Sequence, residues 1–162
     1  MADWKTVRFD PTYEEKLDEE IIPLCDALNA AGFVTTYSCC GHGSRSPKVW
    51  FEHSSDERIE HLARFVLAEE KRLTELPENR LGEQDAQMIS LFPYSTDWQK
   101  ETLLDGYIWS VAIHLTHAYM NTPPAQALEW ATDAIAAVAK LVEEWHQKQA
   151  AKNSETLPGA NG

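Results

Sequence analysis

Residues 33–53 of the chain read FVTTYSCCGHGSRSPKVWFEH, in which two short segments rich in β-branched and aromatic residues enclose a loop. Residues 33–39 and 48–53 have the composition that is typical of β-strands, and the glycines and the proline between them are turn formers. The stretch therefore predicts a strand, a loop and a second strand. We expect residues 36–46 to form the functional part of the protein.

Helical periodicity lies on both sides of this segment. Residues 17–31 place apolar side chains at three- and four-residue spacing and are followed by Gly32, which suits a helix C-cap. The same spacing predicts a second helix over residues 55–76 and a long third helix over residues 122–145. Each helix has one apolar face, which we expect to pack against a sheet.

Two further strands are expected in the second half of the chain. Residues 87–93 and 107–118 are rich in strand formers, and residues 94–106 between them are rich in turn formers. Residues 1–16 are assigned to an edge strand or a packed arm. The order of elements suits an antiparallel or mixed sheet of about four to five strands with helices packed on one face, so the predicted fold class is α+β.

The length of 162 residues fits a single domain. We expect one α+β domain over residues 1–148. Apolar periodicity fails from Gln149 onward, so residues 149–162 are predicted to form a mobile C-terminal tail.

Composition and charge limit the classes of binding partner that we expect. The formal net charge of −12 disfavours binding to bulk nucleic acid, because affinity for phosphate backbones comes mainly from Lys and Arg. No apolar run reaches the roughly 20 residues of a membrane span and the first residues lack a secretory apolar segment, so we expect a cytoplasmic protein with no membrane partner. Three cysteines, two of them adjacent, are expected to be reduced thiols. The oligomeric state stays open.

The loop contains residues that a turn alone does not require. Its glycines allow positive φ angles and close approach of a ligand, and successive N–H groups there can bind an anion. We therefore expect a pocket for a small anionic, nucleotide-like ligand, with Tyr37, Trp50 or Trp109 as a stacking surface for a base. The predicted binding residues are Thr36, Ser38, Cys39, Gly41, Gly43, Ser44, Arg45, Lys48 and Thr116. The simpler alternative is a tight turn with the cysteines filling space beneath it.

An enzyme in the same loop is the second interpretation. His42 would act as general acid or base, with Cys40 or His114 as its partner. If Cys39 points inward, strand alternation directs Cys40 toward the loop. A neighbouring imidazole and backbone N–H groups would there lower the pKa of the Cys40 thiol and make it a nucleophile.

Zinc is a weaker alternative. Cys39, Cys40 and His42 are zinc-ligand types, but structural zinc sites space paired cysteines by about two to four residues, and the chain has no second pair. One Cys with His42 and a distant His114 or His117 is the remaining ligand set. We therefore predict no metal.

The last strand carries the other candidate histidine. Alternation places His114 and Thr116 on one face of it and buries three apolar residues on the other, namely Val111, Ile113 and Leu115. Residues 42–44 and 114–116 are also two His-x-Ser/Thr triplets, which resemble the pair used by two-histidine phosphoesterases. This similarity supports the enzyme interpretation as a phosphodiesterase-like alternative.

Residues 33–42, FVTTYSCCGH, resemble the Thr-Thr-Ser-Ser-Cys-Ser-Gly signature of the tRNA wybutosine-synthesising methyltransferase family. They are also similar to small bacterial and phage proteins with a Cys-x-Gly-His loop. In both groups a helix ending in a breaker precedes the motif and a strand carrying His follows it, an order that agrees over much of residues 20–120. The resemblance implies S-adenosylmethionine as cofactor and a modified guanosine in tRNA as substrate. It carries over to Thr36, Ser38, Cys39 and Gly41, whereas Cys40 stands where the signature has Ser.

A third interpretation is an interaction protein. Its long helix, residues 123–145, would then pair with a partner through an exposed apolar stripe.

Overall fold

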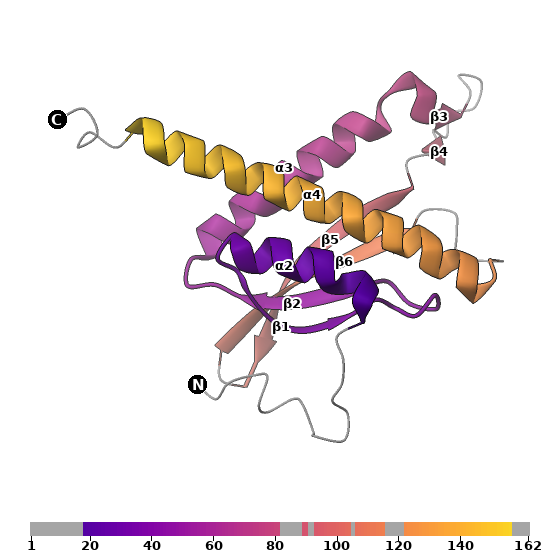
Figure 1. Cartoon of the computed structure of the whole chain (residues 1–162), viewed down its shortest axis with the longest axis horizontal. Coiled ribbons are helices and arrows are strands. Elements are labelled where there is room, and N and C mark those ends of the chain that lie inside the picture. The colour runs from indigo at the N-terminus through magenta and orange to yellow at the C-terminus, as the bar shows by residue number, and fades with distance from the viewer. Residues whose placement is uncertain (1–17, 82–88, 91–92, 105, 116–121, 157–162) are drawn as a thin grey trace.

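The computed structural model describes residues 18–81, 89–90, 93–104, 106–115 and 122–156. They form a four-stranded antiparallel sheet in the order β1-β2-β6-β5, with helices on one face (Figure 1). The predicted α+β class is confirmed. The arm or edge strand predicted for residues 1–16 lies outside the described residues.

The loop stands at one end of this sheet. The four strands are β1 (Val34–Cys39), β2 (Lys48–Glu52), β5 (Tyr94–Leu103) and β6 (Gly106–Leu115). Cys39 pairs with Lys48, and Lys48 pairs with Ala112 on β6. The end of β1, the start of β2 and the end of β6 therefore meet at the loop.

The helices lie close to the predicted ranges, except that α4 continues beyond residue 145. They are η1 (Glu19–Ile21), α2 (Ile22–Ala30), α3 (Asp56–Thr74) and α4 (Pro124–Thr156). Pro23 lies in the first turn of α2, and Gly32 follows that helix with a φ of 96°. The Ser55 hydroxyl accepts the Arg58 N–H at 3.2 Å and so caps α3.

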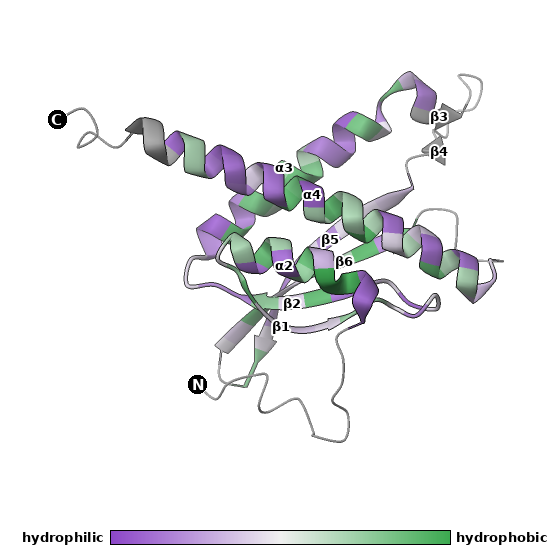
Figure 2. Cartoon of the chain, viewed as in Figure 1, coloured by the Kyte–Doolittle hydropathy of each residue, from purple (hydrophilic) through white to green (hydrophobic). Residues whose placement is uncertain are grey.

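One face of the sheet packs into the core. Alternate side chains of β2 and β6, such as Val49, Phe51 and Ile113, are fully buried against the helices. Figure 2 shows hydrophobic residues concentrated where α2, β2 and β6 meet. We call this side of the sheet the covered face.

The opposite side, the open face, is polar. Glu101 on β5 accepts hydrogen bonds from Lys48 Nζ and Trp50 Nε1, each at 2.9 Å, and so reaches across β6 to β2. Lys48 Nζ also lies 4.6 Å from the centre of the Trp50 ring. Exposed Tyr37 packs against the same indole. Charge pairing and stacking therefore hold the open face together.

One prediction for the second half of the chain is wrong. Residues 94–106 were expected to be rich in turns, but Tyr94–Leu103 is strand β5 and pairs along its length with β6. Its polar residues are those of an edge strand with one face in water. Of the predicted strand 87–93, the structure describes Ile89–Ser90 as strand β4. It pairs with β3 (Arg80–Leu81), which follows the short helix η2 (Pro77–Asn79). These two strands form a second sheet, separate from the four-stranded one.

Helix α4 extends past the predicted domain boundary at residue 148 to Thr156. Its periodic apolar side chains, including Ile135, Val138 and Val142, are buried in the core, so the apolar stripe expected of a partner-binding helix faces inward. Trp130 is the exception, at 42% exposure. Among the described residues, no helix combines the length and the apolar character that crossing a membrane requires.

Candidate functional site

The loop backbone has an unusual left-handed course. Gly41, His42 and Gly43 have φ angles of 82°, 52° and 81°. The Gly41 carbonyl accepts the N–H groups of Ser44 at 2.9 Å and Arg45 at 3.0 Å, which closes the turn. A Cβ atom at Gly41 would lie 2.0 Å from the Arg45 carbonyl oxygen, and one at Gly43 would lie 2.1 Å from the Pro124 carbonyl oxygen. Both glycines are therefore required by the turn and its packing on α4.

Three successive amides of the loop, where an external anion was predicted to bind, already have partners within the chain. The Cys40 N–H donates to Asp18 Oδ2 at 3.0 Å. The next two N–H groups, of Gly41 and His42, point to Cys39 Sγ at 3.3 Å and Cys40 Sγ at 3.4 Å. A carboxylate of the chain itself, that of Asp18, therefore accepts one of the N–H groups that were expected to bind an external anion.

The two cysteines are oriented the other way round from the prediction. Cys40 is 2% exposed and belongs to the hydrophobic core, whereas Cys39 pairs with Lys48 and shares its side of the sheet, the open face. Burial, assisted by the charge of Asp18, raises the pKa of the Cys40 thiol to about 12, despite a hydrogen bond from the His42 backbone. Cys40 is therefore a protonated thiol, and the lowered pKa expected of a nucleophile is not found.

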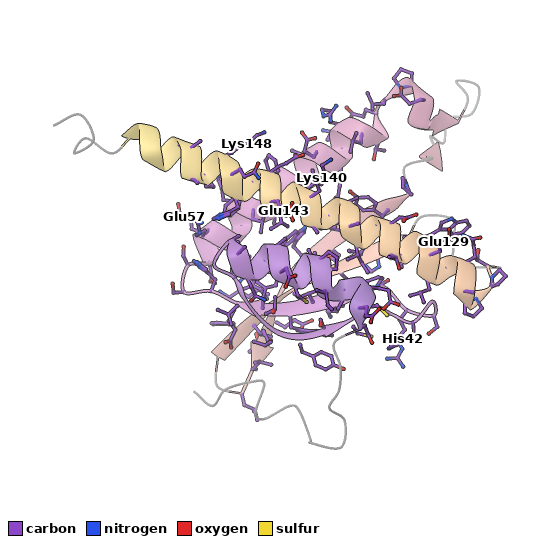
Figure 3. All side chains as sticks on the ribbon, in the orientation of Figure 1. His42, Glu57, Glu129, Lys140, Glu143 and Lys148 are labelled. Atoms are coloured by element: carbon purple, nitrogen blue, oxygen red, sulfur yellow. The ribbon has the colours of Figure 1, made fainter. Side chains whose placement is uncertain are left out.

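Asp18, Cys39 and His42 form a compact cluster at the start of the loop. One ligand atom from each lies within 4.8 Å of the others. His42 Nε2 is 3.6 Å from Asp18 Oδ2, and His42 Nδ1 is 3.6 Å from Cys40 Sγ. Figure 3 shows the labelled His42 at the end of the molecule where α2 begins. The imidazole is mostly in solvent, and the cluster is open on that side.

Asp18 is the residue that the sequence reasoning missed. It directly precedes η1 among several acidic residues, and nothing local distinguishes it from Glu19 or Glu20. Only the return of β1 brings Cys39 and Cys40 beside it, 21 and 22 residues later in the chain.

His114 contacts the other end of the loop. The Ser46 hydroxyl lies 2.8 Å from His114 Nδ1, and His114 Nε2 lies 3.8 Å from Asp97 Oδ2. In the part of the chain that the structure describes, His42 and His114 share no hydrogen bond or ion pair. The composite His42–His114 site therefore resolves into two separate clusters, both at the loop end of the sheet.

The remaining predicted residues differ in their burial and in their contacts. Thr36 is buried and its hydroxyl points to the Trp50 carbonyl at 3.3 Å, while the Ser38 hydroxyl is buried without a hydrogen-bond partner among the described residues. Lys48 is paired with Glu101. Ser44 and Arg45 are exposed, and Thr116 lies outside the described residues.

A separate open cleft of about 750 Å³ lies at the opposite end of the strands. Its walls include His53, Asp56 and Tyr107. Hydrogen bonds from Lys100 and then Trp109 hold the pKa of Asp56 below its usual range. Trp109, which was predicted as a stacking surface for the loop pocket, lines this cleft instead, and none of the predicted loop residues does.

No family model, curated protein or solved structure matches the chain. The resemblance to the tRNA wybutosine-synthesising methyltransferases, with the S-adenosylmethionine and tRNA that it implies, therefore stays a prediction. The geometry of the two clusters is the evidence that bears on function.

Proposed function

We propose that the start of the loop binds a zinc-type divalent ion through Asp18, Cys39 and His42, and that this ion holds a small anionic, nucleotide-like ligand. The observation that carries the proposal is the convergence of the three ligand atoms within 4.8 Å. Carboxylate, thiolate and imidazole are all zinc ligands, and three protein ligands with an open fourth position are typical of zinc sites that bind a further molecule.

Groups behind these ligands support the assignment. The Gly41 N–H donates to Cys39 Sγ at 3.3 Å and so holds the sulfur in place beside the other two ligand atoms. The Cys40 N–H anchors Asp18 at 3.0 Å. The positive φ of His42, 52°, keeps its imidazole beside Asp18 and Cys39. The zinc ligand sets considered from the sequence combined Cys39, Cys40 and His42 with distant histidines and did not include Asp18.

The charge balance makes anion binding depend on the metal. Asp18 and a Cys39 thiolate would repel an anion, and the positive charge of Lys48 is already balanced by Glu101. A divalent cation cancels the two negative charges and leaves a coordination position for a phosphate or carboxylate oxygen.

A stacking surface lies beside this position. Tyr37 and Cys39 are alternate residues of β1 and share the open face with Trp50. The rings of Tyr37 and Trp50 lie 5.1 Å apart, and Tyr37 is 39% exposed. A base attached to the bound anion would stack on the Tyr37 ring.

Cobalt titration tests the metal site, because a cobalt–thiolate bond gives a charge-transfer absorption band. We expect this band in the wild type and in Cys25→Ala, which removes a buried thiol of α2 outside the loop. Cys39→Ser should abolish it and weaken zinc binding by more than about tenfold. Persistence of the band in Cys39→Ser would overturn the proposal.

Asp18→Asn separates a metal ligand from a loop cap. The asparagine side-chain oxygen can still accept the Cys40 N–H, so the fold should be kept, but the lost negative charge should weaken zinc binding by about tenfold or more. Unchanged zinc affinity would show that Asp18 only holds the loop.

Calorimetric titration with AMP tests the ligand, with inorganic phosphate as the control for the anion alone. We expect AMP binding only when zinc is present, and weaker binding after Tyr37→Ala. Equal AMP affinity with zinc and with EDTA would overturn the proposal that the metal holds the ligand. The zinc site itself would still be tested separately by the cobalt titration.

A further inference from the structure

The other end of the loop carries a second constellation, formed by Ser46, His114 and Asp97 on the open face. His114 Nδ1 lies 2.8 Å from the Ser46 hydroxyl oxygen, and His114 Nε2 lies 3.8 Å from Asp97 Oδ2. A hydroxyl, an imidazole and a carboxylate in this order are the parts of a serine nucleophile with its base and its orienting acid.

Strand register brings these residues together. Lys48 pairs with Ala112, and the Ile113 N–H donates to the Pro47 carbonyl at 2.9 Å, so the β2–β6 register continues to place Ser46 opposite His114. Asp97 on β5 pairs with Ala112, two residues from His114 on β6. Diagonal neighbours of this kind are within reach of long side chains.

The two contacts of His114 are compatible with a single tautomer. When Nδ1 accepts the Ser46 hydroxyl proton, the neutral ring carries its own proton on Nε2, the atom that faces Asp97. The carboxylate therefore favours the tautomer that leaves Nδ1 free to act as a base. The side chains of His114 and Asp97 are 50% and 44% exposed, so a substrate can reach the group.

We infer that Ser46, His114 and Asp97 form a nucleophilic relay that hydrolyses small esters. Ser46 Oγ attacks the ester carbonyl carbon while its proton passes to His114 Nδ1, and the alcohol leaves with that proton to give an acyl-Ser46. Water then attacks the acyl group, again with His114 as base, and releases the acid and the free serine. Asp97 is a positioning residue.

The relay and the zinc cluster are separate on the open face. Cys39 and Ala112 lie two strand spacings apart, or about 10 Å, with β2 between them. The relay needs no metal, so it goes beyond the proposed zinc site and can be tested in its absence.

The test uses the full chain with p-nitrophenyl acetate in EDTA. We expect release of p-nitrophenol and, by mass spectrometry, an acetyl group on the peptide that contains Ser46. Ser46→Ala should abolish this adduct, and His114→Ala should slow its formation by about 100-fold or more. Ser95→Ala is the matched control, since Ser95 is exposed and pairs with His114 from β5, and it should react as the wild type does.

Asp97→Asn distinguishes positioning from a structural role. It should lower kcat for p-nitrophenyl acetate without raising KM, because the tautomer changes while the surface of the site stays. Circular dichroism checks that each variant is folded. Absence of an acetyl group on Ser46 in the folded wild type, or the same acetylation rate in His114→Ala, would overturn the relay. Because EDTA removes any metal, neither outcome bears on the zinc proposal.

Discussion

Folding shifts the pKa values of two glutamates on opposite faces of the sheet in opposite directions. Glu70 on α3 packs against β5 on the covered face, is 6% exposed and leaves its Oε1 without a hydrogen-bond partner among the described residues. Burial raises its pKa to about 7, although hydrogen bonds from Thr96 oppose the shift. On the open face, burial also acts against the charge of Glu101, but hydrogen bonds from Lys48, Trp50 and Ser110 outweigh it and lower the pKa.

The comparison shows that apolar packing dominates one face of the sheet and charge pairing the other. On the covered face, a charge has few partners and costs stability, so apolar packing dominates there. On the open face, Lys48 pairs with Glu101 and His114 lies near Asp97, and the residues to which we assign chemistry, Cys39 and His114, lie beside these groups. Substitutions should therefore change mainly stability on the covered face and mainly chemistry on the open face.

The largest expected difference is between two neighbours on β2. Phe51 is fully buried against Phe33 and Trp98, so Phe51→Ala should lower the free energy of unfolding by about 4 kcal/mol. Trp50 lies on the open face, and Trp50→Ala should cost about 1 kcal/mol, since it loses one hydrogen bond and partial packing. Urea unfolding measures both values. Equal losses would break the distinction between the faces.

The adjacent cysteines give the next contrast. With zinc at about one hundred times its Kd, the wild type should gain about 2.7 kcal/mol of stability. Cys39→Ser should keep the metal-free stability and lose this gain, whereas Cys40→Ser should be less stable at any zinc concentration because it places a hydroxyl in the core. Thermal unfolding with zinc or EDTA distinguishes the two, and the reverse pattern would refute the assigned orientations.

Glu70→Gln should stabilise the protein by about 2 kcal/mol at pH 8. The folded-state pKa of about 7 lies above the ordinary 4.5, so the native state holds its proton more tightly than the unfolded chain. Wild-type stability should therefore fall as pH rises from about 4.5 to 7 and level off above that. The variant should lack this slope. Urea unfolding as a function of pH checks it, and a slope retained in Glu70→Gln would assign the effect to another group.

The smallest expected effect is that of Glu101→Gln, a loss of about 1 kcal/mol at pH 7. The folded-state pKa of Glu101 is lowered, so its contribution is present above the unfolded pKa and is lost as pH falls through the folded value. The difference between wild type and variant should therefore shrink in acid. Urea unfolding at pH 7 and in acid measures this difference, and one that grows in acid would contradict the pairing with Lys48.

Local sequence signals were sufficient for the helices and for three of the four strands of the sheet. Strand β5 was missed because its polar residues resemble a loop, although Asp105-Gly106 is a typical hairpin dipeptide and Gly106 closes the β5–β6 pair with Leu103. The position of the loop was predicted correctly from its glycines. Alternation alone could not orient Cys39 and Cys40, because it says that neighbours point apart but not which one points inward.

The amino-acid pattern determines the helices, the paired strands and the left-handed turn at Gly41 and Gly43, because periodicity, capping and positive φ act over a few neighbouring residues. Which groups meet at the loop depends on contacts between distant segments. Helix η1 delivers Asp18 to Cys39, and the pairing of β2, β6 and β5 places Ser46 and Asp97 on either side of His114. Such meetings arise from the packing of the whole chain, since each residue alone resembles many other polar residues in the sequence.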